Sequence, residues 1–199
     1  MFRHSLLVVA PLIASSILIA AACGGSSSNG NASQIQIDRE PITVLAGAAE
    51  GDAQSMEEHA ATMTSIAAAR PDHAHWASDA ELIKANATSL RFLADSARSI
   101  ARDPGSHPAN AVQPERILGD GLNLQGLGAT LIAHAGAMQT HLGIMHDQAA
   151  GDDALLAAIN AGQPDTAAMK RDGRAAIDRG NELADTARRI AASTGEKIE

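Results

Sequence analysis

Apolar residues that recur every three or four positions, in a chain with very few aromatic side chains, limit the possible fold more than any other feature. After residue 22 the aromatic residues are Trp76 and Phe92, and tyrosine is absent. The interior must therefore be built from aliphatic residues and alanine, the residue that most favours helices. No stretch of useful length alternates apolar and polar residues as a strand would. The pattern predicts an all-α, alanine-rich fold.

Prolines, glycines and capping residues divide the chain into segments. They predict one or two helices over 41–70, with Gly47 and Gly51 as weak points, and further helices over 78–102, 114–150, 152–160 and 164–193. The 114–150 segment carries six glycines, which predicts either a break or very close packing against a neighbour. Four long helices predict an antiparallel four-helix bundle, with a short extra helix before the last one.

The N-terminal segment has the features of an export signal. Arg3 and His4 precede an apolar run of about 17 residues, which is short for a membrane span. The run ends in three alanines and Cys23, the only cysteine. This arrangement resembles the lipobox signal peptide of bacterial lipoproteins. The resemblance implies a signal peptide over 1–22, a palmitate-type lipid anchor on Cys23 and an extracytoplasmic location at a bacterial membrane.

The sequence after Cys23 fits a tethered domain. Residues 23–40 begin with glycine, serine and asparagine, which predicts a flexible linker. We expect the helical domain to span 41–193, followed by a C-terminal tail over 194–199. We do not assign this domain to a family.

Composition and missing motifs exclude several functions. The formal net charge is −8 and no basic cluster is present, so we expect neither nucleic acid nor direct binding of anionic lipid headgroups. The chain contains no Glu-x-x-His, His-Glu-x-x-His, Cys-x-x-Cys, P-loop or Gly-x-Ser-x-Gly motif. The sequence therefore predicts no enzyme and no catalytic residue.

Histidines and methionines at helical spacing form the main chemical pattern. On the 114–150 segment they follow steps of four, three and four, which places them on one face, and a second set lies on the 41–70 segment. In an antiparallel bundle both sets approach the same end. Imidazole and thioether ligands together suit copper, and methionine sulfur favours Cu(I). The predicted metal ligands are His59, Met63, His134, Met138, His141 and Met145, with His73, His75 and His146 as further candidates.

The two stripes resemble the helices of small exported bundles of bacterial metal resistance, which carry repeated histidine and methionine. The resemblance covers these stripes alone. It implies that the module binds copper or a similar soft transition metal.

Two alternatives stay open at this stage. Methionine fills gaps in ordinary cores, so the chain could be a structural or protein-interaction lipoprotein without metal. A single His and a single Met could instead hold a b-type haem. On the structural interpretation, His73 and His75 are solvated turn residues and Trp76 closes the end of the bundle. The sequence identifies no protein partner or homo-oligomer.

Overall fold

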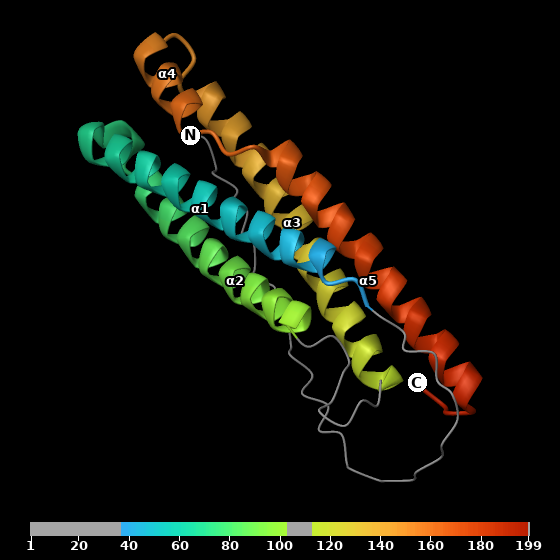
Figure 1. The fold of residues 1–199 in the computed structure, drawn as a ribbon. Helices are drawn as coiled ribbons and strands as arrows, with labels where there is room; N and C mark the ends of the chain where they lie inside the picture. Colours follow the sequence, from blue (N-terminus) through green and yellow to red (C-terminus); the bar gives the residue numbers. More distant parts are fainter. Residues whose placement is uncertain (1–36, 103–112, 199) are drawn as a thin grey trace. The chain divides into compact units, whose positions relative to one another are not determined.

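Helices make up most of the described chain, which comprises residues 37–102 and 113–198 of a computed structural model (Figure 1). The prediction of an all-helical fold is confirmed for these residues, which contain no strand. The signal peptide, Cys23, most of the linker and His107 lie outside the described residues. None of the described helices is both long and apolar enough to span a membrane.

The helix boundaries follow the sequence signals with small shifts. The elements are α1 (Glu40–Ala69), the 3-10 turn η1 (Pro71–His73), α2 (Trp76–Arg102), α3 (Pro114–Gln148), α4 (Asp153–Ala161) and α5 (Thr166–Thr194). The segment 41–70 forms one helix, because Gly47 and Gly51 lie on its surface while the opposite face is buried. The short α4 occupies the place predicted for the extra helix.

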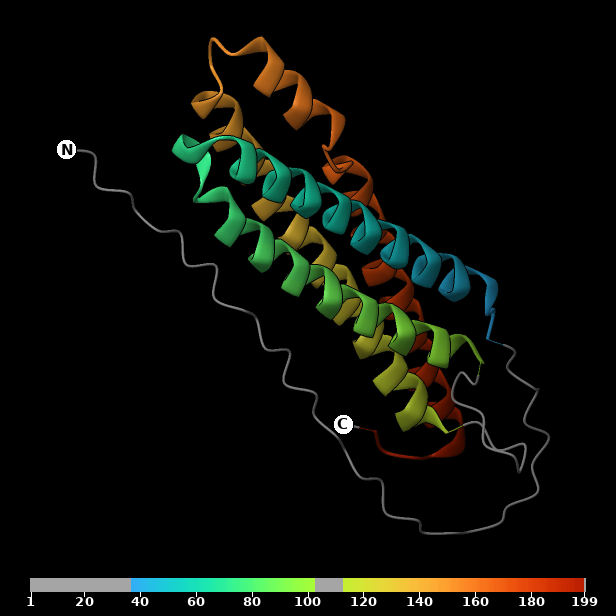
Figure 2. The same ribbon diagram turned by 90° about the vertical axis from the view of Figure 1, so that its left-hand side faces the viewer.

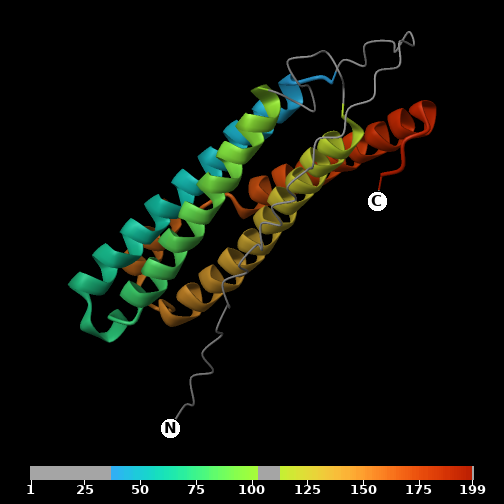
Figure 3. The same cartoon turned by 90° about the horizontal axis from the view of Figure 1, so that it is seen from below.

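The long helices pack mainly as two pairs, α1 with α2 and α3 with α5 (Figures 1 and 2). The pairs meet through smaller contacts of α1 with α5 and of α2 with α3 (Figure 3). At one end of the helices the Trp76 Nε1 atom donates to Gln148 Oε1 at 2.8 Å. At the other end Arg39 donates to the carbonyl oxygen of Arg102. The turn between α1 and α2 therefore lies beside the end of α3.

Glycines bring α3 and α5 close together. A Cβ atom on Gly121 would lie 2.6 Å from the carbonyl oxygen of Gly180, and one on Gly128 would clash with that of Gly173. The glycine with the lower number in α3 contacts the glycine with the higher number in α5, so these two helices run in opposite directions. Of the two expectations for the glycine-rich segment, close packing is correct for these two glycines and a break does not occur. The other four glycines of α3 have open space around them.

Alanines and methionines fill much of the interior. Buried alanines include Ala46, Ala53, Ala60, Ala87, Ala94, Ala135, Ala176 and Ala187. The five methionines of the described chain, Met56, Met63, Met138, Met145 and Met169, are each 3 % exposed or less. Trp76 is also buried and begins α2, two residues before the predicted start. Its burial against the end of α3 matches the expected closure of this end.

Candidate metal centre

His59 is held on α1 with one ring nitrogen free. Its side chain is fully buried, and its Nδ1 atom lies 2.9 Å from the carbonyl oxygen of Gly162. A carbonyl oxygen only accepts hydrogen bonds, so Nδ1 carries the proton and donates it. In the neutral ring Nε2 then bears the lone pair, and this buried atom has no hydrogen-bond partner in the described chain. Metal-binding histidines commonly have their second nitrogen held in this way.

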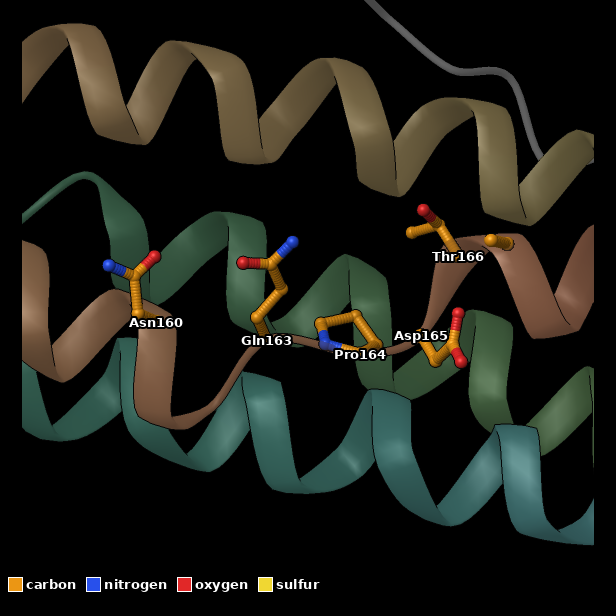
Figure 4. A pocket seen from close by; sticks show the side chains of 6 residues that line it. Asn160, Gln163, Pro164, Asp165 and Thr166 are labelled. Atoms are coloured by element: carbon orange, nitrogen blue, oxygen red, sulfur yellow. The ribbon is translucent and has the colours of Figure 1, made fainter.

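Gly162 belongs to the connection between α4 and α5 that lies along α1. Figure 4 shows this connection with the side chains of Asn160, Gln163, Pro164, Asp165 and Thr166. A Cβ atom on Gly162 would meet the side chain of Thr62, with 2.6 Å to its Oγ1 atom. The lack of a side chain at residue 162 therefore allows its carbonyl group to reach His59.

His141 brings a second imidazole from α3. The ring centres of His59 and His141 lie 6.3 Å apart, and the ring planes meet at 81°. The His141 Nε2 atom is also buried without a hydrogen-bond partner in the described chain. Two helices that contribute little contact to each other thus bring two unpaired imidazole nitrogens into one region.

Burial keeps both rings in the neutral form that a metal ion needs. Desolvation lowers the pKa of His59, the hydrogen bond to Gly162 opposes this shift, and nearby His141 adds to it. Desolvation also lowers the pKa of His141, with Asp79 raising it and His75 lowering it further. Neutral imidazole is the ligating form.

Thioethers accompany each ring. Met63 follows His59 by four residues on α1, and Met145 follows His141 by four residues on α3, so each pair shares a helix face. Met138 precedes His141 by three residues and is also buried. Helical spacing therefore puts Met138 and Met145 on the same face of α3 as His141, and Met63 on the same face of α1 as His59.

His134 does not join this group. It lies seven residues before His141, which is about 10 Å along the helix axis, and one ion cannot reach both rings. Burial lowers the pKa of His134, and its Nε2 atom is buried without a hydrogen-bond partner in the described chain. His134 is therefore a separate buried imidazole and is not part of the His59–His141 pair.

The three further candidate histidines differ from one another. His73 is 8 % exposed and stacks on Trp76 with 4.5 Å between ring centres, so the expectation of a solvated turn residue is wrong for it. Trp76, three residues later, covers the ring, a contact that the sequence pattern does not reveal. His75 is exposed, as expected, and acts electrostatically on His141. His146 follows His141 by five residues and lies about 140° around α3, on another face.

The sequence interpretation missed two groups. No sequence pattern indicates the Gly162 carbonyl, because its role depends on where the α4–α5 connection crosses α1. Asp52 had a signal, since it precedes His59 by seven residues and shares its helix face. Asp52 is 9 % exposed, and its Oδ2 atom has no hydrogen-bond partner in the described chain.

Carboxylates and histidines alone do not form a metal site here. No group of three or more His, Cys, Asp or Glu residues in the described chain is arranged to hold a metal ion. A metal centre at His59 and His141 would therefore require thioether ligands, which restricts it to soft metals.

Comparisons with protein-family models, with characterised proteins and with solved structures found no match for this chain.

Proposed function

We propose that this chain is a membrane-anchored, extracytoplasmic helical module that binds copper or a similar soft transition metal between α1 and α3. The observation that carries the proposal is the pair of buried Nε2 atoms on His59 and His141, in rings whose centres are 6.3 Å apart. Two metal–nitrogen bonds of about 2 Å each, plus roughly 1 Å from each nitrogen to its ring centre, span about 6 Å. The pair has the spacing of two ligands of one ion.

The frame of this module is an antiparallel four-helix bundle. The opposed glycine pairs of α3 and α5 and the contact of Trp76 with Gln148 support this arrangement. In such a bundle α1 and α3 are diagonal neighbours, so a side chain from each meets in the centre.

The nitrogen ligands in this proposal are His59 and His141, and the sulfur ligands come from Met63, Met138 and Met145. His75 lies on the exposed turn near His141, so it is placed to pass an ion from solvent to the buried pair. The lipid anchor on Cys23 keeps the module at the membrane and plays no part in this site.

The cost of unpaired buried nitrogens also favours a ligand. A buried polar group without a hydrogen bond costs about 1–3 kcal/mol. A scaffold selected for stability alone would gain by replacing such groups with leucine. A bound ion satisfies both nitrogens at once and removes the cost.

The test is metal binding by the full chain with Cys23→Ser, so that no thiol competes for the ion. We expect one Cu(I) per chain after anaerobic loading and dialysis, and loss of that ion in His59→Gln and His141→Gln. His146→Gln is the matched control, because it removes a histidine from another face of the same helix. Failure to retain the ion, or an equal loss in the control, would contradict the proposal and favour a structural protein without metal.

The membrane anchor is tested separately with an alkyne analogue of palmitate in bacterial cells that make the chain. We expect Cys23-dependent labelling and recovery in the membrane fraction. Cys23→Ser should abolish the labelling and release the chain. Equal labelling of both proteins would contradict lipidation at Cys23.

A further inference from the structure

The ligand set around His59 and His141 carries no negative charge. Both rings are neutral imidazoles, and the neighbouring candidates Met63, Met138 and Met145 are thioethers. The described chain places no third His, Cys, Asp or Glu with them in a metal-binding group. An ion that enters this region therefore keeps its full charge in a largely buried environment.

The charge of the ion decides how costly this is. The free energy of moving an ion from water into a medium of low dielectric constant grows with the square of its charge. The desolvation penalty of a divalent ion is therefore about four times that of a monovalent ion of the same size. Structural zinc sites offset that cost with thiolate or carboxylate ligands. No such ligand is grouped with His59 and His141, and Asp79, the carboxylate that acts on His141, belongs to no metal-binding group, so little here offsets the charge of a divalent ion.

The number of available ligands also favours a monovalent soft ion. Zn²⁺ takes four ligands in a tetrahedron, and Cu(II) favours four nitrogen or oxygen ligands near one plane. The pair supplies two nitrogens, from rings that meet at 81° with 6.3 Å between their centres. His134 is about two turns away along α3 and supplies no third nitrogen. Two nitrogens with thioethers beside them suit a soft ion that accepts few ligands.

We propose that the His59–His141 pair selects monovalent soft cations, namely Cu(I) and its redox-inert analogue Ag(I), over Zn(II) and Cu(II). This inference rests on the proposed metal-binding function and adds the charge of the ion that the site takes. The selection follows from uncharged ligands in a buried position, so adding one anionic ligand should relax it.

The experiment compares four ions on the full chain with Cys23→Ser. Each ion is supplied alone, Cu(I) without oxygen and with a reductant, and the bound amount is measured by equilibrium dialysis and elemental analysis. We expect one Ag(I) or Cu(I) per chain, lost in His141→Gln, and binding of Zn(II) and Cu(II) weaker by roughly 100-fold or more. The melting temperature should rise with Ag(I) and stay unchanged with Zn(II).

A second pair of variants tests the reason for the selectivity. Met63→Cys replaces the thioether with a shorter side chain that can ionise to a thiolate, and it should strengthen Zn(II) binding by about tenfold or more. Met63→Leu removes the sulfur without adding charge, so it should weaken Ag(I) binding and leave Zn(II) binding weak. The comparison of ions on the protein with native Met63 stands even if a variant fails to fold.

The outcomes separate the two proposals. Binding of Zn(II) as tight as that of Ag(I), both dependent on His141, would overturn the selectivity and leave the metal-binding function intact. Retention of no ion at all would overturn both. Tighter Ag(I) binding together with a Zn(II) gain in Met63→Cys would support both.

Discussion

The contribution of Asp52 to the free energy of unfolding should fall as the pH rises from about 4 to about 7. This carboxyl group is buried in the face of α1 that packs towards α5, and its Oδ2 atom has no hydrogen-bond partner in the described chain. Burial raises its pKa from 3.8 to about 7, with smaller contributions from Asp172 and Asp165 of α5. The α2 arginines that reach α1 pair with Glu50 and Glu57 instead.

The sign follows from proton binding. Between pH 4 and 7 the folded protein holds the Asp52 proton while the unfolded chain has released it, so raising the pH favours the unfolded chain. Above pH 7 both states are ionised and the loss is complete. A shift of about three pKa units corresponds to about 4 kcal/mol. Asp52→Asn mimics the protonated form at every pH and should escape this loss.

The assay is urea unfolding followed by circular dichroism from pH 4 to pH 9. The free energies of unfolding of Asp52→Asn and the unmodified chain should agree near pH 4. They should diverge by up to about 1.4 kcal/mol per pH unit, with the variant more stable at pH 8. Asp178→Asn removes one exposed charge from α5 and controls for net charge. Asp172→Asn lowers the folded-state pKa of Asp52, so the divergence should end at a lower pH and be smaller. A difference that stays constant across the range would refute the reasoning.

Three further outcomes follow from the packing and the burial of the histidines. Gly128→Ala should destabilise the fold by about 2 kcal/mol or more in urea unfolding, because the new Cβ atom would clash with the α5 backbone. Gly126→Ala, two residues earlier on the opposite side of α3 and in open space, should instead stabilise it by about 0.5–1 kcal/mol. The lowered pKa values of His59, His134 and His141 make a contribution to stability that is present above pH 6.5 and lost as the pH falls below it. His134→Leu should therefore flatten the acid limb of the stability profile, whereas an unchanged limb would contradict burial of the neutral ring.

The helices could be predicted from the sequence because their signals are local. Pro114 and the Asp165 cap mark the starts of α3 and α5, and both helices begin at or within two residues of the predicted positions. The start of α2 was placed two residues late, because the burial of Trp76 depends on its contact with Gln148 rather than on a cap. That contact is between residues far apart in the chain.

From the sequence, the candidate site can be predicted only as histidines and methionines that share one face of each helix. Helical spacing places His134 and His141 on one face, and it cannot tell which of them meets His59. The meeting with His141 depends on the register between α1 and α3, which the α4–α5 connection and the glycine contacts of α5 help to set. The position of the Gly162 carbonyl group and the acidic side chains that act on Asp52 follow from the same register, so no local pattern reveals them.

Two of the unpaired polar groups, Asp52 and His59, share one face of α1, and this arrangement supports a binding role. Asp52 and His59 lie two turns apart on that face, with the buried Met56 between them, and each has a buried atom without a hydrogen-bond partner in the described chain. Both groups interact with the segment that follows α4. The charge of Asp165 acts on Asp52, and the Gly162 carbonyl accepts a hydrogen bond from His59. Each group costs stability in the absence of a partner. Replacing Asp52 by leucine should therefore stabilise the metal-free protein and leave metal binding intact. Replacing His59 by leucine should abolish metal binding, and it also removes the donor to the Gly162 carbonyl. A loss of binding from both changes would mean that Asp52 also takes part in the site.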